Sequence, residues 1–244
     1  MNYVITGGTD GIGKAIVKNL LSCSASAEDK LIVNYGHSEE KAAALLAEMS
    51  EGDRKKVLLI KADLSCEDTL DAFVQKICEV CGEVDYLISN VGVGEYARFE
   101  DYTIDKWNRV LTTNLTIPTF LVQKLLHRLR YGGSVLLVGS YAGIRAYSSS
   151  VVYSVTKAGI NFLARTLVKE LEPRGVRVNA IAPGFVETAW QTGRSEESYH
   201  RINNKIALHR FGTPEEVAEM ACGVLTNTYM NGSVVEIHGG YEYF

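Results

Sequence analysis

The sequence predicts an α/β fold in which a doubly wound, parallel sheet of about seven strands carries helices on both faces. Short, β-branched and almost continuously apolar runs alternate with helical patterns along the whole chain, as expected for strands buried on both faces. A glycine-rich turn follows the first run, and no linker, repeat or low-complexity segment divides the 244 residues. We therefore expect a single domain over residues 1–244, with right-handed crossovers between its strands.

The predicted strands are short apolar runs of β-branched character. They are Tyr3–Ile5, Leu31–Asn34, Val57–Lys61, Tyr86–Ser89, Ser134–Val138, Val176–Ile181 and Val234–Ile237. Helix start signals lie between them: Ser65–Asp68 has the pattern of a capping box, and Thr213–Glu216 combines a cap, a first-turn proline and two acids. Two long helices are expected over Trp107–Leu129 and Ser154–Leu171, each with apolar residues on more than one face.

The segment Phe185–Leu208 interrupts this alternation, because it is long, polar and rich in Gly, Ser and Glu. Long irregular inserts in compact domains are usually functional or disordered. The segment follows a predicted strand end, which is where open α/β sheets bind their ligands. We expect a loop and a short helix that cover the substrate, with a plain surface insertion as the alternative.

Composition and charge exclude several classes of function. The chain is 46% hydrophobic and 22% charged, and its net charge of −4 provides no basic footprint for nucleic acid. No apolar run approaches the ~18 residues that a membrane span needs. The first predicted strand begins at Tyr3, which leaves no room for a signal peptide, so we expect a cytoplasmic protein that binds no membrane.

The cysteines and histidines predict no metal site. Five cysteines fit a reducing compartment better than a disulfide framework. Cys78 and Cys81 have the spacing of a redox or metal pair, but they lie near the end of an apolar-periodic helix, without a second such pair or a nearby histidine. Small buried or helix-end cysteines are therefore the expected reading, and the five histidines show no metal-ligand spacing.

Gly7, Gly11 and Gly13 follow the first strand and open the first helix. Glycines there permit a tight turn and a close backbone approach to a pyrophosphate, and the helix N-terminus supplies unpaired N–H groups. The strand–loop–helix context distinguishes a dinucleotide-binding loop from an ordinary glycine-rich turn. The sequence therefore predicts a nucleotide cofactor.

Tyr153 and Lys157 lie one helical turn apart on one face of the second long helix. A phenol is a poor acid or base near neutral pH, because its reference pKa is about 10. A fixed cation about 4 Å away would favour the phenolate by roughly 4 kcal/mol at an effective dielectric constant of about 20. The spacing predicts that Lys157 lowers the pKa of Tyr153; an ordinary exposed helix face is the alternative.

Together, the glycine loop and the Tyr-x-x-x-Lys pair resemble the short-chain dehydrogenase/reductase family, and the resemblance runs over nearly the whole chain. The Gly-x-x-x-Gly-x-Gly spacing is that of this family, not the Gly-x-Gly-x-x-Gly of other Rossmann enzymes. Three stretches look most like its 3-oxoacyl-(acyl-carrier-protein) reductases: Arg177–Thr188, Arg210–Ala218 and His238–Gly240. The resemblance implies an oxidoreductase with a single NAD(P)-binding Rossmann domain over 1–244 and a substrate loop at about 185–208.

The resemblance also implies four catalytic residues. Tyr153 would be the general acid in the reducing direction, and Lys157 would bond the nicotinamide ribose. Ser140 ends the fifth predicted strand, thirteen residues before Tyr153, and would orient the substrate carbonyl. Asn114 would hold a water in the proton path.

Further residues are expected at the cofactor. Asp63 would bond the adenine amino group, unless it only neighbours a helix cap. Val91, between Asn90 and Gly92, replaces the alanine that the family usually carries, which adds bulk beside the cofactor. The complete expected set is Gly7, Thr9, Asp10, Gly11, Ile12, Gly13, Asn34, Tyr35, Ser38, Asp63, Leu64, Asn90, Gly92, Tyr153, Lys157, Pro183, Gly184, Val186 and Thr188.

The choice between NADP and NAD depends on the end of the second strand. NAD-binding Rossmann proteins usually carry an acid there, which bonds the ribose 2′-OH. Tyr35 occupies that place, and His37 or Ser38 could bond a 2′-phosphate. Asp10 occupies the position where many NADP-dependent members carry Arg, and no Lys or Arg follows Tyr35 directly. NADP is the expected cofactor, with NAD as the alternative.

The expected reaction transfers a hydride between the nicotinamide and a carbonyl or alcohol carbon of a small molecule, with a 3-oxoacyl group on an acyl carrier protein as the first candidate. The alternatives are a dehydrogenase of a sugar alcohol, a steroid or another small secondary alcohol, and a non-enzymatic nucleotide sensor on the same fold. An acidic carrier protein would need a basic docking patch, for which the candidates are Arg128, Arg130 and Arg174.

The family pairs its two long helices with their symmetry mates, so the resemblance implies a homotetramer of D₂ type. The aromatic tail Tyr241–Phe244 is expected to be ordered at a subunit contact, with a frayed terminus as the alternative.

Overall fold

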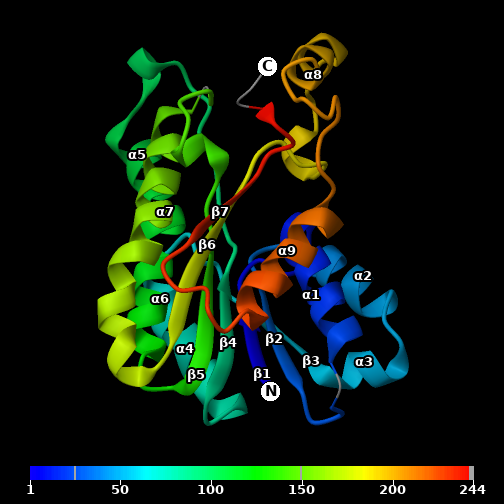
Figure 1. Ribbon diagram of the computed structural model, residues 1–244, viewed down its shortest axis with the longest axis vertical. Helices are drawn as coiled ribbons and strands as arrows, with labels where there is room; N and C mark the ends of the chain where they lie inside the picture. The colour runs from blue at the N-terminus through cyan, green and yellow to red at the C-terminus, as the bar shows by residue number, and fades with distance from the viewer. Residues whose placement is uncertain (25, 149, 242–244) are drawn as a thin grey trace.

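A seven-stranded sheet forms the centre of the molecule (Figure 1). The computed structural model describes residues 1–24, 26–148 and 150–241. The strand order is β3-β2-β1-β4-β5-β6-β7, and neighbouring strands are parallel throughout. The strands are β1 Asn2–Ile5, β2 Lys30–Tyr35, β3 Val57–Lys61, β4 Val84–Ser89, β5 Leu129–Val138, β6 Arg177–Pro183 and β7 Val234–Ile237. The predicted doubly wound parallel sheet is therefore confirmed.

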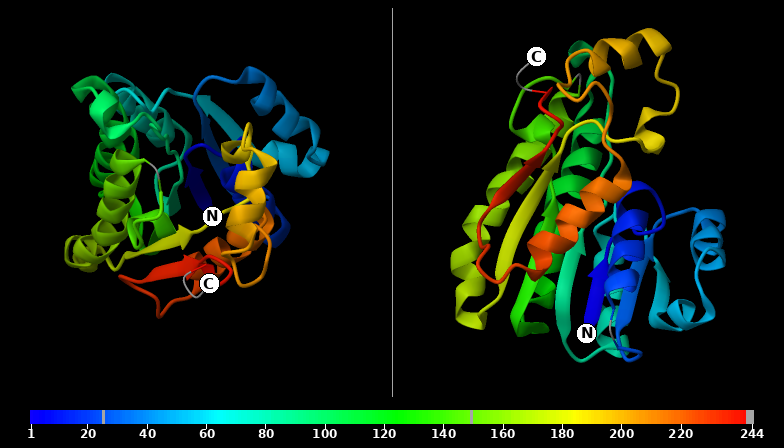
Figure 2. Two further views of the ribbon diagram at one scale, coloured as in Figure 1. Left: turned by 90° about the horizontal axis from the view of Figure 1, so that it is seen from above. Right: turned by 45° about the vertical axis from the view of Figure 1, so that its right-hand side comes forward.

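Helices cover both faces of the sheet, as Figure 2 shows from above. The α-helices of the described chain are α1 Gly11–Cys23, α2 Glu39–Ala47, α3 Glu51–Lys56, α4 Asp68–Val80, α5 Ile104–Leu111, α6 Ile117–Leu125, α7 Val151–Leu171, α8 Glu196–Asn203 and α9 Pro214–Thr226. On one face, Phe73 of α4, Leu121 of α6 and Ile160 of α7 pack in one core with the strands. On the other, Ile16 of α1 and Val217 of α9 belong to the second core. Full burial of each such side chain contributes about 1.5–3 kcal/mol, so the two layers hold the strand ends in fixed positions.

The strand order reverses between β1 and β4. The connections after these two strands leave the sheet in opposite directions, which opens a crevice at their carboxyl ends. The loops that follow β1, β4, β5 and β6 all meet at this edge. The fold therefore positions a ligand site there before any side chain is considered.

The predicted continuous helix Trp107–Leu129 is wrong. The chain forms α5, a π-helical turn over Thr112–Thr116 and then α6, which ends at Leu125, while Leu129 already begins β5. Pro118 has no amide hydrogen, so the carbonyl of Asn114, four residues earlier, lacks its regular helical donor. The wider turn accommodates this break, and π turns of this kind are frequent at functional sites.

The predicted capping box at Ser65–Asp68 is also wrong. Helix α4 begins after Glu67, whose backbone is already helical and whose side chain makes no cap bond. Asp63 competes for Ser65: both the Ser65 amide (2.9 Å) and its hydroxyl (2.7 Å) donate to Asp63 Oδ1. The predicted cap at Thr213 is confirmed, and it is part of a capping box, since Thr213 and Glu216 cap each other's backbone N–H groups at the start of α9.

Candidate active site

A cavity of about 310 Å³ lies at the carboxyl ends of β1, β4, β5 and β6. It contains thirteen of the residues that the sequence places at the catalytic centre or the cofactor. They are Gly7, Asp10, Gly11, Ile12, Asn90, Gly92, Ser140, Tyr153, Lys157, Pro183, Gly184, Val186 and Thr188. These residues come from segments far apart in the chain, so the sheet topology brings them together.

The glycine loop is as tight as a phosphate-binding turn requires. Gly7 has φ +63, in the region that favours glycine. A Cβ on Gly13 would lie 2.1 Å from the Gly7 carbonyl oxygen, so no larger residue fits there. Asn90 fixes the loop from β4, because its Nδ2 donates to the carbonyls of Thr6 (3.1 Å) and Gly7 (3.0 Å).

Asn34 supports the glycine loop from the protein interior and is not among the residues that line the cavity. It is buried, its Oδ1 accepts from Gly7 N at 3.2 Å, and its Nδ2 donates to the Ala62 carbonyl at 2.9 Å. Leu64 is likewise buried in the core. The expected contacts of Asn34 and Leu64 with the cofactor can therefore be made only through their backbones.

The charged groups at the end of β2 are arranged in pairs. Tyr35 donates to Glu39 at 2.7 Å, and Lys61 pairs with the same carboxylate at 2.7 Å. Lys41 pairs with Asp10, which caps α1 by accepting from Gly11 N. Ser38 caps α2 by accepting from Lys41 N at 3.2 Å.

Sequence reasoning missed Lys41, which stands six residues beyond Tyr35 in the first turn of α2. The signal was available in part, since Ser38 is a typical cap residue and Lys41 is the third residue of the helix that it caps. Lys41 pairs with Asp10, the carboxylate that disfavours NADP in the sequence-based prediction. His37 lies 3.5 Å from Asp63 in a second, more exposed pair.

Ser140, Tyr153 and Lys157 converge between β5 and α7. Ser140 and Tyr153 are linked by a side-chain hydrogen bond. Lys157 is buried and its Nζ donates to the Val138 carbonyl at 2.7 Å. Gly92 closes the other side, because a Cβ there would stand 3.4 Å from Lys157 Nζ.

Asn114 anchors the loop that carries Gly92. Its Oδ1 accepts from Val93 N (2.8 Å), and its Nδ2 donates to the Val93 carbonyl (2.9 Å) and to Thr156 Oγ1 (3.1 Å). The Asn114 side chain therefore has its partners within the protein, so a part in a proton path would fall to its backbone carbonyl, which lacks its regular helical donor.

Burial governs the titration of the catalytic pair. Burial raises the pKa of Tyr153 to about 12, against a smaller lowering from the Ser140 hydrogen bond. Burial also lowers the pKa of Lys157 to about 8. The prediction that Lys157 lowers the pKa of Tyr153 is wrong for this structure, since Lys157 Nζ lies 5.8 Å from the centre of the Tyr153 ring and bonds the backbone instead.

The segment Phe185–Leu208 forms a loop with η5 Ala189–Gln191 and the short helix α8, as predicted. Trp190 brings its ring centre to 5.3 Å from that of Tyr153, and Gln191 Nε2 donates to the Val186 carbonyl at 3.1 Å. The segment thus forms one wall of the cavity. Neither residue was singled out from the sequence, because Trp and Gln carry no motif there.

A second cavity, of about 420 Å³, adjoins the first and shares Ser140, Tyr153 and Trp190 with it. Tyr147, also missed from the sequence, bonds Ser140 as well, and burial raises its pKa. Tyr147 packs against Tyr241, with ring centres 4.9 Å apart. Of the predicted aromatic tail, only Tyr241 lies within the described residues.

The three arginines considered for carrier docking lie at the opposite end of the sheet. Arg128 and Arg130 flank the amino end of β5, and Arg174 donates to the Leu129 carbonyl there. Arg130 is also paired with Glu83 and Asp85, at 3.0 Å each. Because β5 ends at the cavity and begins at these residues, a partner docked on them would be a full strand length from Tyr153.

The described ranges contain neither a membrane-spanning helix nor a cluster of metal-ligating side chains. No helix there is long and apolar enough to cross a membrane. Among the same residues, no three His, Cys, Asp or Glu side chains are grouped so that they could hold a metal ion. Cys81 is buried and its thiol donates to the Ile77 carbonyl at 3.5 Å.

Comparison with known proteins assigns the chain to a family. Residues 7–242 match the family model described as enoyl-(acyl carrier protein) reductase. A 3-oxoacyl-(acyl-carrier-protein) reductase of Aquifex aeolicus is 34% identical over 242 residues, which cover 97% of this chain and 95% of the relative. The chain belongs to the short-chain dehydrogenase/reductase family. It is therefore an oxidoreductase that acts on carbonyl or alcohol groups with NAD(P).

Other members are similar to a comparable degree. Glucose 1-dehydrogenase 2 of Bacillus subtilis is 32% identical, over 97% of this chain and 93% of its own length. A short-chain dehydrogenase from Burkholderia cenocepacia, solved in complex with NADP, superposes with a TM-score of 0.89 at 26% identity, covering 98% of this chain and 97% of that one. Relatives with different substrates are thus about equally similar to this chain.

The site fits a nicotinamide dinucleotide. The glycine cradle has no room for a Cβ at Gly13, and the amide end of α1 points to where a pyrophosphate would lie. Gly92, Lys157 and Pro183 line the part of the cavity next to Tyr153, where the nicotinamide end would be held.

Proposed function

We propose that the protein is an NADP(H)-preferring reductase of a small carbonyl compound, with NAD(H) as the less favoured cofactor. The observation that carries this proposal is the hydrogen-bonded pair of Ser140 and Tyr153, set beside buried Lys157 at the mouth of the dinucleotide cradle. The bound nicotinamide would supply the hydride. The protein would supply orientation and the proton.

Each catalytic residue then has one task. Tyr153 donates its phenolic proton to the carbonyl oxygen, and its raised pKa keeps it in the protonated form that a reduction needs. Ser140 donates to the same oxygen and holds it against the phenol. Lys157 binds the ribose hydroxyls next to the nicotinamide, and the π turn at Asn114 connects the site to water.

The preference for NADP is supported by the charges at the end of β2. A 2′-phosphate there would meet Lys41 and His37, while Glu39 and Asp10 are each paired with a lysine. The repulsion from Asp10 is thus offset within the protein. No carboxylate at Tyr35 competes for the ribose hydroxyl as it would in an NAD-selecting site.

For the substrate, we propose a 3-oxoacyl thioester first, and a sugar or other small secondary alcohol second. The Aquifex aeolicus relative supports the former and the Bacillus subtilis glucose dehydrogenase supports the latter. The test is a panel of 3-oxoacyl thioesters, simple ketones and polyols, each with NADPH or NADP⁺ and with NADH or NAD⁺, followed by nicotinamide absorbance. Turnover of none of them with either cofactor would overturn the proposed function.

A further inference from the structure

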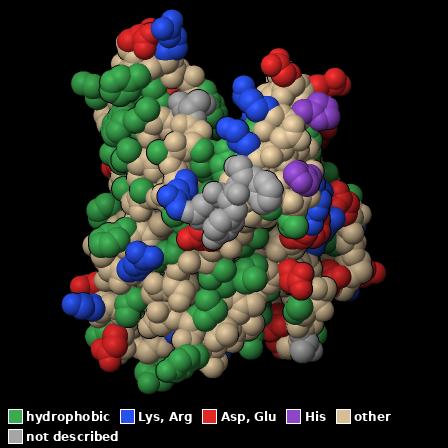
Figure 3. Space-filling model, turned by 45° about the horizontal axis from the view of Figure 1, so that its top comes forward, with side chains coloured by type: hydrophobic (Ala, Val, Ile, Leu, Met, Phe, Trp, Pro, Cys, Tyr) green, Lys and Arg blue, Asp and Glu red, His purple; other side chains and the backbone are tan. Residues whose placement is uncertain are grey.

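The second cavity is strongly cationic. Three of its lining residues carry a positive charge, Arg194, Arg201 and Lys205, and no described Asp or Glu lines it. The protein as a whole has a net charge of −4, so the positive charge of this cavity is opposite in sign to that of the whole chain. In Figure 3, Lys and Arg side chains gather on the α8 side of the hollow at the top of the molecule.

These cations have no carboxylate partner within the part of the chain that the structure describes. Among residues 1–24, 26–148 and 150–241, Arg194, Arg201 and Lys205 make no ion pair, whereas cations elsewhere, such as Lys61 and Arg210, do. Like charges that gather around one hollow repel one another, and half-buried Arg194 also loses part of its hydration, whereas Arg201 and Lys205 are exposed. An anion that enters from solution relieves both costs.

Two of the cations, Arg194 and Arg201, are positioned by the protein. Arg194 is half-buried, donates to Gln191 Oε1 at 2.9 Å and to Ser198 Oγ at 3.1 Å, and lies 5.6 Å from the centre of the Phe185 ring. Arg201, one turn along α8, contacts the same Ser198 hydroxyl at 3.5 Å. Both guanidinium groups therefore lie on one side of α8, and that side faces the cavity.

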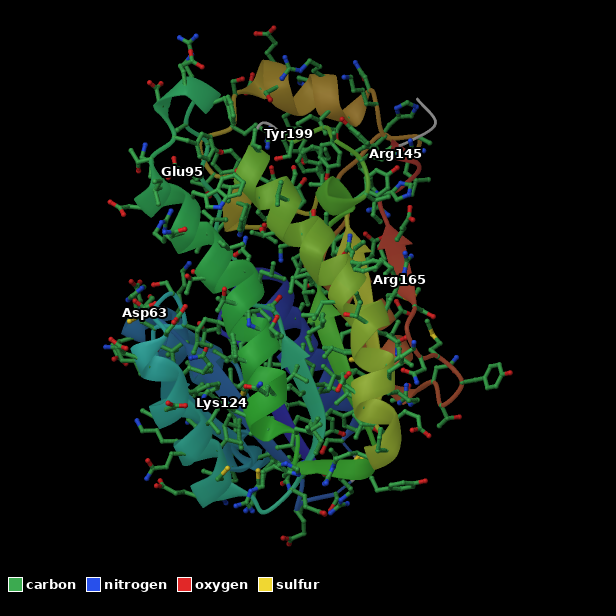
Figure 4. All side chains as sticks on the ribbon, turned by 90° about the vertical axis from the view of Figure 1, so that its left-hand side faces the viewer. Asp63, Glu95, Lys124, Arg145, Arg165 and Tyr199 are labelled. Atoms are coloured by element: carbon green, nitrogen blue, oxygen red, sulfur yellow. The ribbon has the colours of Figure 1, made fainter. Side chains whose placement is uncertain are left out.

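The same cavity holds the groups proposed to act on the carbonyl. Ser140 and Tyr153 line it together with the three cations. Tyr96 also lines this cavity; burial raises the pKa of its phenol, and the positive charge of Arg194 partly offsets that rise. Figure 4 shows Tyr199 of α8 and Glu95, next to Tyr96, at the same end of the molecule.

We propose that the substrate is an anionic carbonyl compound, whose carboxylate or phosphate is bound by Arg194, Arg201 and Lys205 while Ser140 and Tyr153 hold its carbonyl. This inference rests on the proposed function and adds the chemical class of the substrate. The guanidinium fork suits both anions, since it presents paired donors to two oxygens at once.

The first measurement compares matched substrates. A series of linear oxo acids of increasing length is assayed against their neutral amides, to test a carboxylate. Acetoacetyl-coenzyme A is assayed against the acetoacetyl thioester of N-acetylcysteamine, to test a phosphate. The proposal expects kcat/KM for one anionic member to exceed that of its neutral counterpart by roughly 10- to 100-fold, the value of one or two charged hydrogen bonds.

The second measurement removes the charges. Arg201→Gln and Lys205→Gln, singly and together, should lower kcat/KM for the anion by about tenfold each, mainly through KM, and leave the neutral counterpart and the affinity for NADPH unchanged. Lys76→Gln is the matched control, because Lys76 lies exposed on α4, distant from the cavity, and its loss changes the net charge equally.

Calorimetric titration of each matched pair into the protein–NADP⁺ complex decides the inference even without turnover. Anion binding that is lost in the double variant supports the inference, and if no carbonyl is then reduced, only the proposed function fails. Equal binding and turnover of the anion and its neutral counterpart, unchanged in the double variant, would overturn the inference and leave the reductase proposal intact.

Discussion

Tyr153 donates the proton in the proposed reaction, and this role depends on its phenolic oxygen alone. Tyr153→Phe keeps the ring against Trp190 but removes the hydroxyl that bonds Ser140. We expect kcat to fall by about 10²-fold or more while cofactor affinity changes little. Steady-state kinetics and a cofactor titration measure the two effects, and near-normal turnover of the variant would refute the assignment.

Lys157 is a functional group held at a cost in stability. Its pKa is lowered from 10.5 to about 8 by burial, so the unfolded chain binds more protons than the folded chain between these values. The free energy of unfolding should therefore rise with pH across this window, and the penalty at neutral pH is roughly 3 kcal/mol.

The substitution Lys157→Met tests both properties. Turnover and cofactor affinity should both fall, because Lys157 has both roles in the proposal. The unfolding free energy of the wild type minus that of the variant should increase from about pH 8 to about pH 10, below the titration of the buried tyrosines. Denaturant melts at each pH measure this difference; a difference that is flat with pH would show that Lys157 is not desolvated.

Lys41 sets the cofactor preference in our proposal, by neutralising Asp10 and meeting the 2′-phosphate. We expect the unmodified protein to prefer NADPH by roughly tenfold or less in kcat/KM, about 1.4 kcal/mol. Lys41→Met should abolish or reverse this preference, and Asp10→Arg should increase it and make it more sensitive to salt. Lys18→Met, which removes a lysine that is paired with Glu48 on the outer side of α1, is the control. A tenfold preference for NADH in the unmodified protein would contradict the proposal.

The π turn between α5 and α6 is the element on which the position of Asn114 depends. Pro118→Ala restores an amide hydrogen four residues after Asn114 and permits a regular helix, which would rotate Asn114 away from Val93. We expect turnover to fall by about tenfold, since small displacements of positioning groups are costly, while thermal stability is unchanged or higher. Loss of both activity and stability would instead indicate a merely structural proline.

Sequence patterns predicted the elements better than their interruptions. Because burial on both faces leaves a continuous apolar signal, the apolar runs located the strands of the described sheet within two residues, except that β5 begins at Leu129 and not at Ser134. The π turn was not predicted, because Val110, Ile117 and Leu121 keep the apolar spacing of a helix across it. The cap at Ser65 failed because Asp63, two residues earlier, binds the same hydroxyl. Both outcomes depend on local hydrogen bonding, which the spacing of apolar residues does not predict.

The residues of the site divide in the same way. Tyr153, Lys157, Ser140 and the glycine loop follow from motifs with fixed spacing. The pair of Lys41 with Asp10 and the cations of the second cavity do not, because they depend on how α2 and α8 fold back over the strand ends. Titration was also misjudged from sequence: spacing places Lys157 near Tyr153, but only the structure shows how completely both are buried.

At the scale of the molecule, the outer face of α7 predicts self-association. Phe162 is 62% exposed and Val155 47% exposed, and with Val151 they follow one stripe of the helix. Figure 4 views the molecule onto α6 and α7, whose labelled Lys124 and Arg165 mark this side. An exposed apolar stripe of this kind commonly marks an interaction surface.

We propose that this stripe pairs with its copy in a D₂ homotetramer. Phe162→Glu would place like charges on both sides of a two-fold contact, so we expect it to reduce the assembly to smaller species. Light scattering at micromolar concentration measures this, with Tyr229→Glu as the control, because Tyr229 is almost fully exposed on the turn before β7. A monomeric wild type would contradict the proposal.

The contact between Trp190 and Tyr153 gives the protein a built-in optical reporter. The chain has two tryptophans, Trp107 on α5 and Trp190 in the wall of the cavity. In a Trp107→Phe background, all indole emission would come from a ring 5.3 Å from the catalytic phenol. Energy transfer from that indole to reduced nicotinamide would then report cofactor binding in real time and without any attached dye. A later change in the emission would report movement of the segment Phe185–Leu208.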